Sequence, residues 1–421
     1  MLPFCIFCDF FEYDESLMWT KISIGVLAVT LASLSWMLTP LGGQQEASSL
    51  PQLTPVAQAA PVHVQKPVCY AFQPRNIPHV DAPTPPSRLQ GKLGLFVAEV
   101  DPVTLAFKRV VSRDANSSFP LASTYKQAVM YELARQVDQG EVSLKEIFDV
   151  TQSNHSLGEF PYDGSDVNTL AVRMIKNSDN TATDILQRRV GLRKVQANID
   201  ALNLCKTRMI MTTKGWWTAQ ASMSPMFPKN REALLKAAEE YGKLRGEALY
   251  QKAEALDQDA QKVFWLDLDK AITRYFESDR YDPRVDLNTH NVSTPAELAV
   301  FLSHEFLRNG LNPQTDKWFR EVMATAPNGS RLALPHEYFG GKGGNGWRIL
   351  TYSGYLLGKD GKHYVYAFLN QESGHTYTMR DTGAAFIWIN QAFKALQALP
   401  EASPPALQAS PQGNAERGTP Q

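Results

Sequence analysis

Three short strings of residues, spaced widely along the chain, constrain its fold more than any other feature. They are Ser123-Thr124-Tyr125-Lys126, Ser178-Asp179-Asn180 and Lys342-Gly343-Gly344. Each string alone is weak evidence, because such combinations recur by chance. Their order, their spacing and the residues around them indicate one site that is assembled from three distant segments.

The residue types in these strings predict a serine nucleophile with a lysine base. A serine hydroxyl needs an adjacent base to accept its proton, and Lys126 lies on the same helical face as Ser123. Burial and nearby positive charge lower the pKa of a lysine enough for this role. We expect Ser178 to relay a proton to the leaving nitrogen and Asn180 to bind the substrate amide. Lys342 would attract a substrate carboxylate and help lower the pKa of Lys126.

The surroundings of the strings predict an α/β fold, an α+β sandwich with an antiparallel sheet flanked by helices and a helical subdomain. Apolar residues recur at helical spacing from 123 to 139, directly after Phe119-Pro120. A nucleophile in the first turn of that helix lies at the positive end of the helix dipole. Runs typical of strands and of a closing helix flank the strings, at 93–98, 107–111, 347–355, 363–370 and 384–399.

With these residues identified, the chain resembles the class A serine β-lactamases and their penicillin-binding relatives, from about Leu93 to Leu399. The resemblance is carried by the stretches 119–126, 177–183 and 342–346. It implies that Ser123 is the acylated nucleophile and Lys126 its base, with Ser178 and Asn180 as the second motif. It also implies that Lys342 and Gly344 line the substrate site, and that the backbone N–H groups of Ser123 and Asn345 form the oxyanion hole.

The sequence departs from the family pattern at two places. Gly343 stands where a hydroxyl residue usually helps to hold the substrate carboxylate, so that binding should be weaker or supplied by another donor. The glutamate that activates the deacylating water is also missing. Aligning Leu287-Asn288 with the family's leucine-asparagine places Arg284 at the glutamate, with Asp286 or Asp282 as substitutes. Trp216-Trp217 offers a second alignment, again without a glutamate.

Length and composition predict one catalytic domain, at 89–399, with appendages. Residues 1–43 form a leader in which the apolar run 22–38 suits a membrane anchor or a long signal-peptide core. We expect an uncleaved anchor and an exported domain in the cell envelope. A Pro/Ala-rich tether at 44–88 and a disordered tail at 400–421 complete the chain.

A helical insertion at about 213–280 interrupts the family pattern. Residues 229–268 are charged, with apolar side chains at near-helical intervals, which predicts one or two amphipathic helices. Two interpretations stay open: a lid or docking element that reshapes the substrate entrance, or a solvated helical hairpin on the surface.

The remaining composition narrows the possible ligands. With 42 basic and 43 acidic side chains, nothing suggests nucleic acid binding. The eight histidines are scattered, so we expect no metal and no cofactor. A Cys69–Cys205 disulfide is an option in an oxidising compartment.

These observations favour a serine hydrolase that acts on a β-lactam or a peptidoglycan-like peptide and then hydrolyses the acyl-enzyme. The first alternative is a penicillin-binding or D-Ala-D-Ala carboxypeptidase-like enzyme with slow deacylation. The second is a non-catalytic sensor of cell-wall fragments. Five intact polar residues argue against the sensor, namely Ser123, Lys126, Ser178, Asn180 and Lys342.

Overall fold

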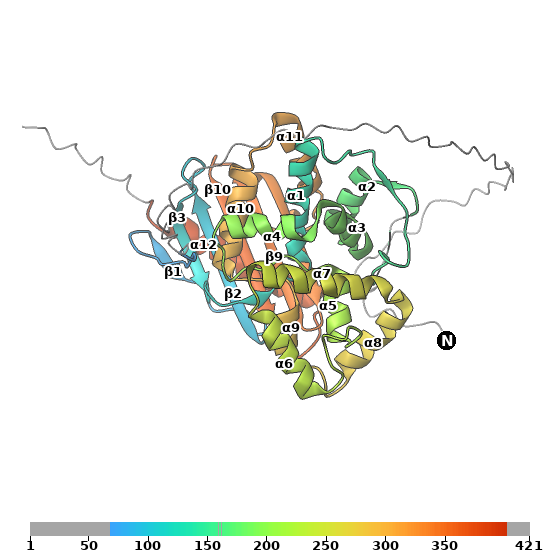
Figure 1. Cartoon of the computed structure of the whole chain (residues 1–421). Coiled ribbons are helices and arrows are strands. Elements are labelled where there is room, and N and C mark those ends of the chain that lie inside the picture. Colours follow the sequence, from blue (N-terminus) through green and yellow to red (C-terminus); the bar gives the residue numbers. More distant parts are fainter. Residues whose placement is uncertain (1–67, 159, 161, 402–421) are drawn as a thin grey trace, which may run out of the picture. The chain divides into compact units, whose positions relative to one another are not determined.

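A six-stranded sheet organises the molecule (Figure 1). The computed structural model describes residues 68–158, 160 and 162–401. The strand order is β1-β3-β2-β10-β9-β8, so that strands from both ends of the described chain pair side by side. The sheet strands are β1 (His79–Asp81), β2 (Lys92–Val100), β3 (Phe107–Arg113), β8 (His336–Gly346), β9 (Ile349–Gly358) and β10 (His363–Gln371). Two-residue strands pair separately: β4 (Phe119–Pro120) with β7 (Val292–Ser293), and β5 (Ile147–Phe148) with β6 (Ser165–Asp166).

The predicted fold class is confirmed, with one addition. All pairings in the six-stranded sheet are antiparallel except that of β1 with β3, which is parallel. The helices are α1 (Lys126–Asp138), α2 (Val167–Val172), α3 (Asn180–Val190), α4 (Leu192–Ala201), α5 (Thr213–Gln220), α6 (Arg231–Gly242), α7 (Gly246–Lys262), α8 (Trp265–Glu277), α9 (Pro283–Thr289), α10 (Pro295–Leu307), α11 (Pro313–Ala324) and α12 (Met379–Ala398). Shorter turns are η1 (Ala122–Tyr125), η2 (Arg173–Asn177) and η3 (Gly329–Arg331).

Helices cover both faces of the sheet. On one face, Trp388 of α12 makes an edge contact with Phe368 of β10. On the other, a Cβ atom added to Gly94 of β2 would lie 2.7 Å from Pro295 of α10, so only glycine permits this close approach. Since Gly94 pairs with Leu369, the neighbour of Phe368, the two contacts lie on opposite faces. Both faces are therefore buried, and the near-continuous apolar run of β2 follows from this.

The part of the predicted tether that the structure describes, residues 68–88, is packed against the sheet rather than extended from it. His79–Asp81 adds an edge strand beside β3. Phe72 is buried against Phe96 with ring centroids 4.9 Å apart, and Trp388 donates to the carbonyl of Pro83 at 2.6 Å. Residues 68–88 thus complete the edge of the sheet. The tether was predicted from composition, and composition does not show which residues pair with a strand.

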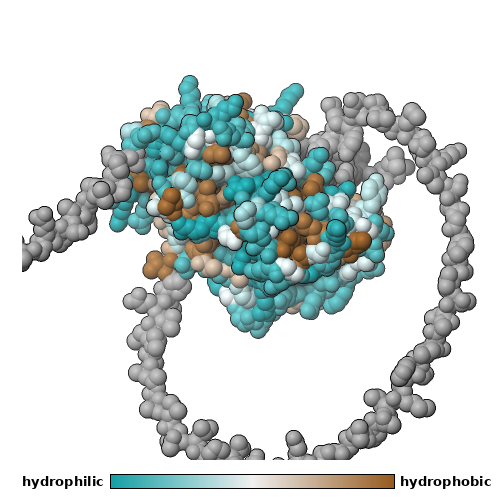
Figure 2. Space-filling model, turned by 90° about the horizontal axis from the view of Figure 1, so that it is seen from above, coloured by the Kyte–Doolittle hydropathy of each residue, from teal (hydrophilic) through white to brown (hydrophobic). Residues whose placement is uncertain are grey.

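Other predictions fall on residues outside the described ranges. The leader and its apolar run at 22–38, the tether up to residue 67 and the tail after residue 401 are among them. Within the part of the chain that the structure describes, no helix combines the length and apolar character that crossing a bilayer requires. The surface is largely hydrophilic in the view of Figure 2, with apolar side chains in scattered patches.

Candidate active site

The nucleophile candidate lies in a tight turn that precedes α1. Ser123 is half-buried in η1, and α1 begins at Lys126, about one turn later than the predicted helix start at residue 123. Ala122, directly before Ser123, has φ of 44°, which is uncommon for a residue with a side chain. Strand β4 fixes the entry to this turn by pairing with β7. The local backbone thus exposes Ser123 while it buries the lysine that follows.

Lys126 is buried and bound to the second motif. Its Nζ donates to the backbone carbonyl of Ser178 at 2.6 Å, to Asn180 Oδ1 at 2.8 Å and to Ser178 Oγ at 3.3 Å. Burial lowers the pKa of Lys126 to about 7, although the charges of Asp179 and Asp184 act in the opposite direction. A lysine with this pKa is partly neutral near pH 7 and has a lone pair available to accept a proton.

The second motif is held by a helix start. Ser178 has φ of 57° at the end of η2, and Asp179 caps α3 by accepting from the N–H of Ala182 at 2.8 Å. Arg173 pairs with the buried Asp179 carboxylate at 3.0 Å. Asn180, the first residue of α3, also donates to the carbonyl of Leu157 at 3.0 Å. These bonds turn Ser178 and Asn180 toward Lys126.

Strand β8 brings the third motif against the nucleophile turn. A Cβ atom on Gly344 would lie 2.5 Å from the backbone N of Ser123 and 3.0 Å from that of Thr124, so a side chain at this position has no room. Asn345 follows and is exposed. The predicted oxyanion-hole donors, the N–H groups of Ser123 and Asn345, therefore belong to neighbouring segments.

Lys342 lies buried in the same strand, and its Nζ donates to the carbonyl of Gly343 at 2.6 Å. Burial, and then the charge of Lys126, lower the pKa of Lys342 well below its usual value. We expected Lys342 to help lower the pKa of Lys126. Burial is the largest cause of the lowered pKa of Lys126, and the effect of Lys126 on the pKa of Lys342 indicates that the two ammonium groups are close enough to repel each other.

The space beside Gly343 is filled by a side chain that the sequence did not single out. A Cβ atom at Gly343 would lie 2.6 Å from Asn328 Nδ2 and 2.8 Å from Tyr352 Cε1. Asn328 is nearly buried, and among the described residues its side-chain amide makes no hydrogen bond. An amide donor thus stands beside the position where the family's hydroxyl is missing.

The chain between Arg208 and Val292 forms a closed loop of helices, here called the helical excursion (residues 209–291). Reciprocal backbone hydrogen bonds of 2.8 Å between Arg208 and Val292 close its neck. The Asn291 side chain bonds both the N–H and the carbonyl of Met211. The excursion contains α5 to α9. The predicted insertion at about 213–280 covers α5 to α8, and the stretch 229–268, where one or two helices were predicted, covers α6, α7 and the start of α8.

Within the excursion, α5 borders the candidate site. The Thr213 hydroxyl donates to Asp184 Oδ1 at 2.8 Å and lies 3.4 Å from the carbonyl of Asn180. Trp216 makes an edge contact with Tyr125 of η1. Helix α9 packs mainly against α6, so the geometry favours the alignment through Trp216-Trp217 over that through Leu287-Asn288. The eight residues of α5 include no aspartate or glutamate.

The two aspartates considered as substitutes are engaged elsewhere. Asp282 caps α9 and pairs with Arg284 at 2.7 Å. Asp286 is buried and accepts from Gln220 at 2.6 Å and from Tyr281 at 3.0 Å. Burial raises the pKa of Asp286 well above its usual value. Neither carboxyl is a free, ionised base.

The option of a Cys69–Cys205 disulfide is realised, with the two Cα atoms 5.5 Å apart. It ties the segment before β1 to the chain just before the neck of the excursion. No cluster of three or more histidine, cysteine, aspartate or glutamate side chains is arranged for a metal ion within the described residues.

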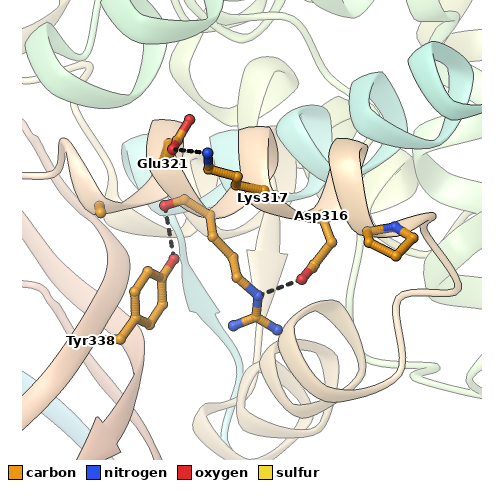
Figure 3. Close-up of a pocket in the computed structure, with 7 residues that line it drawn as sticks. Asp316, Lys317, Glu321 and Tyr338 are labelled. Carbon is orange, nitrogen blue, oxygen red and sulfur yellow. Dashed lines mark hydrogen bonds and ion pairs between the residues drawn. The ribbon is translucent and has the colours of Figure 1, made fainter.

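A hollow elsewhere contains none of the predicted site residues (Figure 3). Its charged groups are already paired: Arg320 with Asp316 at 2.8 Å and Lys317 with Glu321 at 3.7 Å. The Tyr338 hydroxyl donates to the carbonyl of Arg320 at 3.0 Å. The hollow is lined by Pro313, Asp316, Lys317, Arg320, Glu321, Ala324 and Tyr338.

Known proteins were compared with this chain in three ways. The sequence matches the model of the Beta-lactamase enzyme family over residues 88–388, more than half of the chain. A search of curated proteins found no match. Similar solved structures include the class A β-lactamase of the last common ancestor of Gram-negative bacteria, with 18% identity, 73% of this chain and 95% of that one covered, and a TM-score of 0.48. Another is the class A β-lactamase from Mycobacterium abscessus, with 15% identity, coverages of 74% and 96%, and a TM-score of 0.48.

The match to the family model and the convergence of the three strings on one site lead to the same conclusion. The chain belongs to the Beta-lactamase enzyme family and is a β-lactamase-like serine hydrolase that acts on amide bonds.

Proposed function

We propose that Ser123 attacks the amide carbonyl of a β-lactam or a peptidoglycan-like peptide and forms an acyl-enzyme. The observation that carries this proposal is the buried Lys126, hydrogen-bonded to Ser178 and Asn180 and with its pKa lowered to about 7. Neutral Lys126 accepts the Ser123 proton as the hydroxyl oxygen adds to the carbonyl carbon. Ser178 passes a proton to the leaving nitrogen when the amide C–N bond breaks. The N–H groups of Ser123 and Asn345 stabilise the oxyanion.

Substrate binding in this proposal uses Lys342 of β8 and the neighbouring Asn328. A substrate carboxylate lies beside Lys342, and the Asn328 amide supplies the hydrogen bond that a hydroxyl at position 343 would otherwise give. Two observations support that role: the Asn328 amide makes no hydrogen bond with a described residue, and its Nδ2 would lie 2.6 Å from a Cβ atom at position 343.

We further propose that hydrolysis of the acyl-enzyme is slow, as in a penicillin-binding or carboxypeptidase-like enzyme. The supporting observation is α5, which borders Asn180 and Tyr125 yet carries no carboxylate. Water activation by a carboxylate base therefore has no evident source in this helix.

Intact-mass spectrometry of the protein mixed with a penicillin tests both parts. The expected result is a one-to-one adduct on Ser123 that persists after free drug is removed, and no adduct on Ser123→Ala. The matched control is Ser330→Ala, an exposed serine in η3 that should label normally. Rapid loss of the adduct with many turnovers would show fast hydrolysis, as in a class A β-lactamase. No adduct on the unaltered protein would contradict the acylation and favour a non-catalytic sensor of cell-wall fragments.

For location, we propose export to the cell envelope, with residues 22–38 as the membrane anchor. The Cys69–Cys205 disulfide supports an oxidising compartment. Membrane fractionation of the full chain, beside a form that begins at residue 44, measures this. Recovery of the full chain in the soluble fraction would refute the anchor.

A further inference from the structure

Helix α8 touches both rims of the candidate site. Its first residue, Trp265, packs on the ring of His155 with centroids 4.7 Å apart. Near its end, Phe276 stacks on Trp347 with centroids 5.1 Å apart and planes 10° from parallel. The two aromatic residues are eleven positions apart, which corresponds to about 16 Å along a helix axis. Both contacts are made by large, flat side chains, so they fix the helix at each end.

The first rim is the loop that carries His155. In this loop the Leu157 carbonyl accepts from Asn180 at 3.0 Å, and the Ser156 hydroxyl lies 2.9 Å from that of Thr213. His155 is also in contact with Phe160, at 4.5 Å between ring centroids. The loop is therefore bonded directly to a residue of the second motif and to α5.

The second rim is the turn between β8 and β9. Trp347 comes two residues after Asn345, whose N–H is a predicted oxyanion-hole donor. Tyr281, which follows α8, lies beside Trp347 and beneath the guanidinium of Arg348, 5.3 Å from the ring centroid. The turn that ends the substrate-side strand is thus enclosed by side chains of the helical excursion.

Between the two rims α8 packs against α5, the helix that borders Ser123's turn through Trp216. The helix is therefore more than a solvated hairpin on the surface, because it joins the segment next to Asn180 to the segment next to Asn345. Apolar side chains at its beginning are exposed, with Phe264 and Leu266 at 41% and 37%.

We propose that α8 is a specificity-determining wall that limits the size of the acyl substituent entering the site. The inference rests on the proposed acylation of Ser123. A substrate whose acyl group is slim passes between the rims, whereas a branched or multi-ring group collides with the wall held by Trp265 and Phe276. Acylation by the bulky donor is then slower, while the reaction at the carbonyl is the same for both.

The test measures the rate of Ser123 acylation by two penicillins that share one ring nucleus, one with a short straight acyl substituent and one with a branched aromatic substituent. Unaltered protein should prefer the slim donor by about tenfold or more, the discrimination that differences of one to three kcal/mol in a pocket produce. Trp265→Ala releases one end of α8 and should bring the ratio of the two rates close to one. Phe276→Ala should do the same from the other end.

Matched variants separate the wall from a general effect on folding. Leu266→Ala removes an exposed side chain from the same helix and should leave the ratio unchanged, and Trp265→Phe, which keeps a ring, should preserve most of it. If Phe276→Ala does not fold, Trp265→Ala decides alone, since Trp265 is only half-buried.

An unchanged ratio in Trp265→Ala would overturn the inference, as would an equal loss of rate with both donors. If neither penicillin labels the unaltered protein, the proposed acylation is refuted, and the proposed role of α8 is refuted with it. If the unaltered protein is labelled but Trp265→Ala shows the same ratio of the two rates, only the proposed role of α8 is refuted.

Discussion

Two regions border the candidate site. One consists of the segments that hold Ser123, Lys126 and Lys342, and the other is the helical excursion. They differ in how their charged groups are used. In the first, two lysines are buried, neither forms an ion pair with a described residue, and their pKa values are lowered. In the second, Asp257 pairs with Arg188 at 2.8 Å, and Asp286 is buried with its pKa raised. The segments with the two lysines keep amino groups that are not neutralised by an ion pair with a described residue, whereas the excursion uses Asp257 in an ion pair that holds helices together. The groups proposed to form the acyl-enzyme thus lie outside the excursion, whose Asp257 and Asp286 are engaged in contacts between its own helices and their neighbours.

The largest effect that would sharpen this comparison is expected from Lys126→Ala. Removing the base should slow acylation by a β-lactam by about 10² to 10⁴-fold, measured as the rate of adduct formation. Lys317→Ala, an exposed lysine in α11, is the matched control and should have no effect. An unchanged rate in Lys126→Ala would remove the lysine from the role of base.

The pH dependence of acylation should follow the pKa of Lys126. Only the neutral amine accepts a proton, so the rate should fall about tenfold per unit below pH 7 and level off above it. Acylation rates between pH 5 and pH 9 at constant ionic strength measure this, with Lys126→Ala lacking the inflection. An acylation rate that rises as the pH falls would contradict the role of neutral Lys126 as the base, because a protonated amine cannot accept a proton.

A smaller effect is expected from Asn328→Ala. Loss of one hydrogen bond to a carboxylate corresponds to about 1.5 to 3 kcal/mol, or roughly ten- to a hundredfold in the concentration of donor that gives half-maximal acylation. The maximal rate should change little, since Asn328 takes no part in the proposed proton transfers. A donor whose carboxylate is esterified should show no difference between the two proteins. The same loss with the ester would indicate a structural role for Asn328.

The smallest effect is expected in the excursion itself. Asp286 is buried with a raised pKa and accepts hydrogen bonds from Gln220 and Tyr281, so Asp286→Asn replaces a group that is already engaged with one of similar shape. The lifetime of the acyl-enzyme, followed by intact mass, should stay the same. A markedly longer lifetime would identify Asp286 as a contributor to deacylation and end the contrast between the two regions.

Sequence patterns predicted the parts of the site that rest on local order. The helix after Phe119-Pro120 and the strands predicted at 93–98 and 363–370 each follow from residues close to one another in the chain. The start of β9 was misplaced by two residues, because Trp347 and Arg348 form the turn before it. The alignment through Leu287-Asn288 stays a prediction, although α9 packs mainly against α6, whereas α5 borders Asn180 and Tyr125. Asn328 was not singled out in the sequence, and the helical insertion was predicted without the contacts that α8 makes, because local sequence does not specify which distant residues a side chain will meet.

The sequence by itself determined the family, the three motifs and the alternation of buried strands, because these depend on short-range spacing and on the apolar pattern. Tertiary structure alone decided which groups are charged and which segments meet. Burial lowers the pKa of Lys126 only when Ser178 and Asn180 close over it, 52 and 54 residues away. The approach of Gly344 to Ser123, the amide beside Gly343 and the span of α8 between two rims likewise arise from packing. Desolvation and contact depend on which side chains are neighbours in space, and these neighbours come from residues far apart in the sequence.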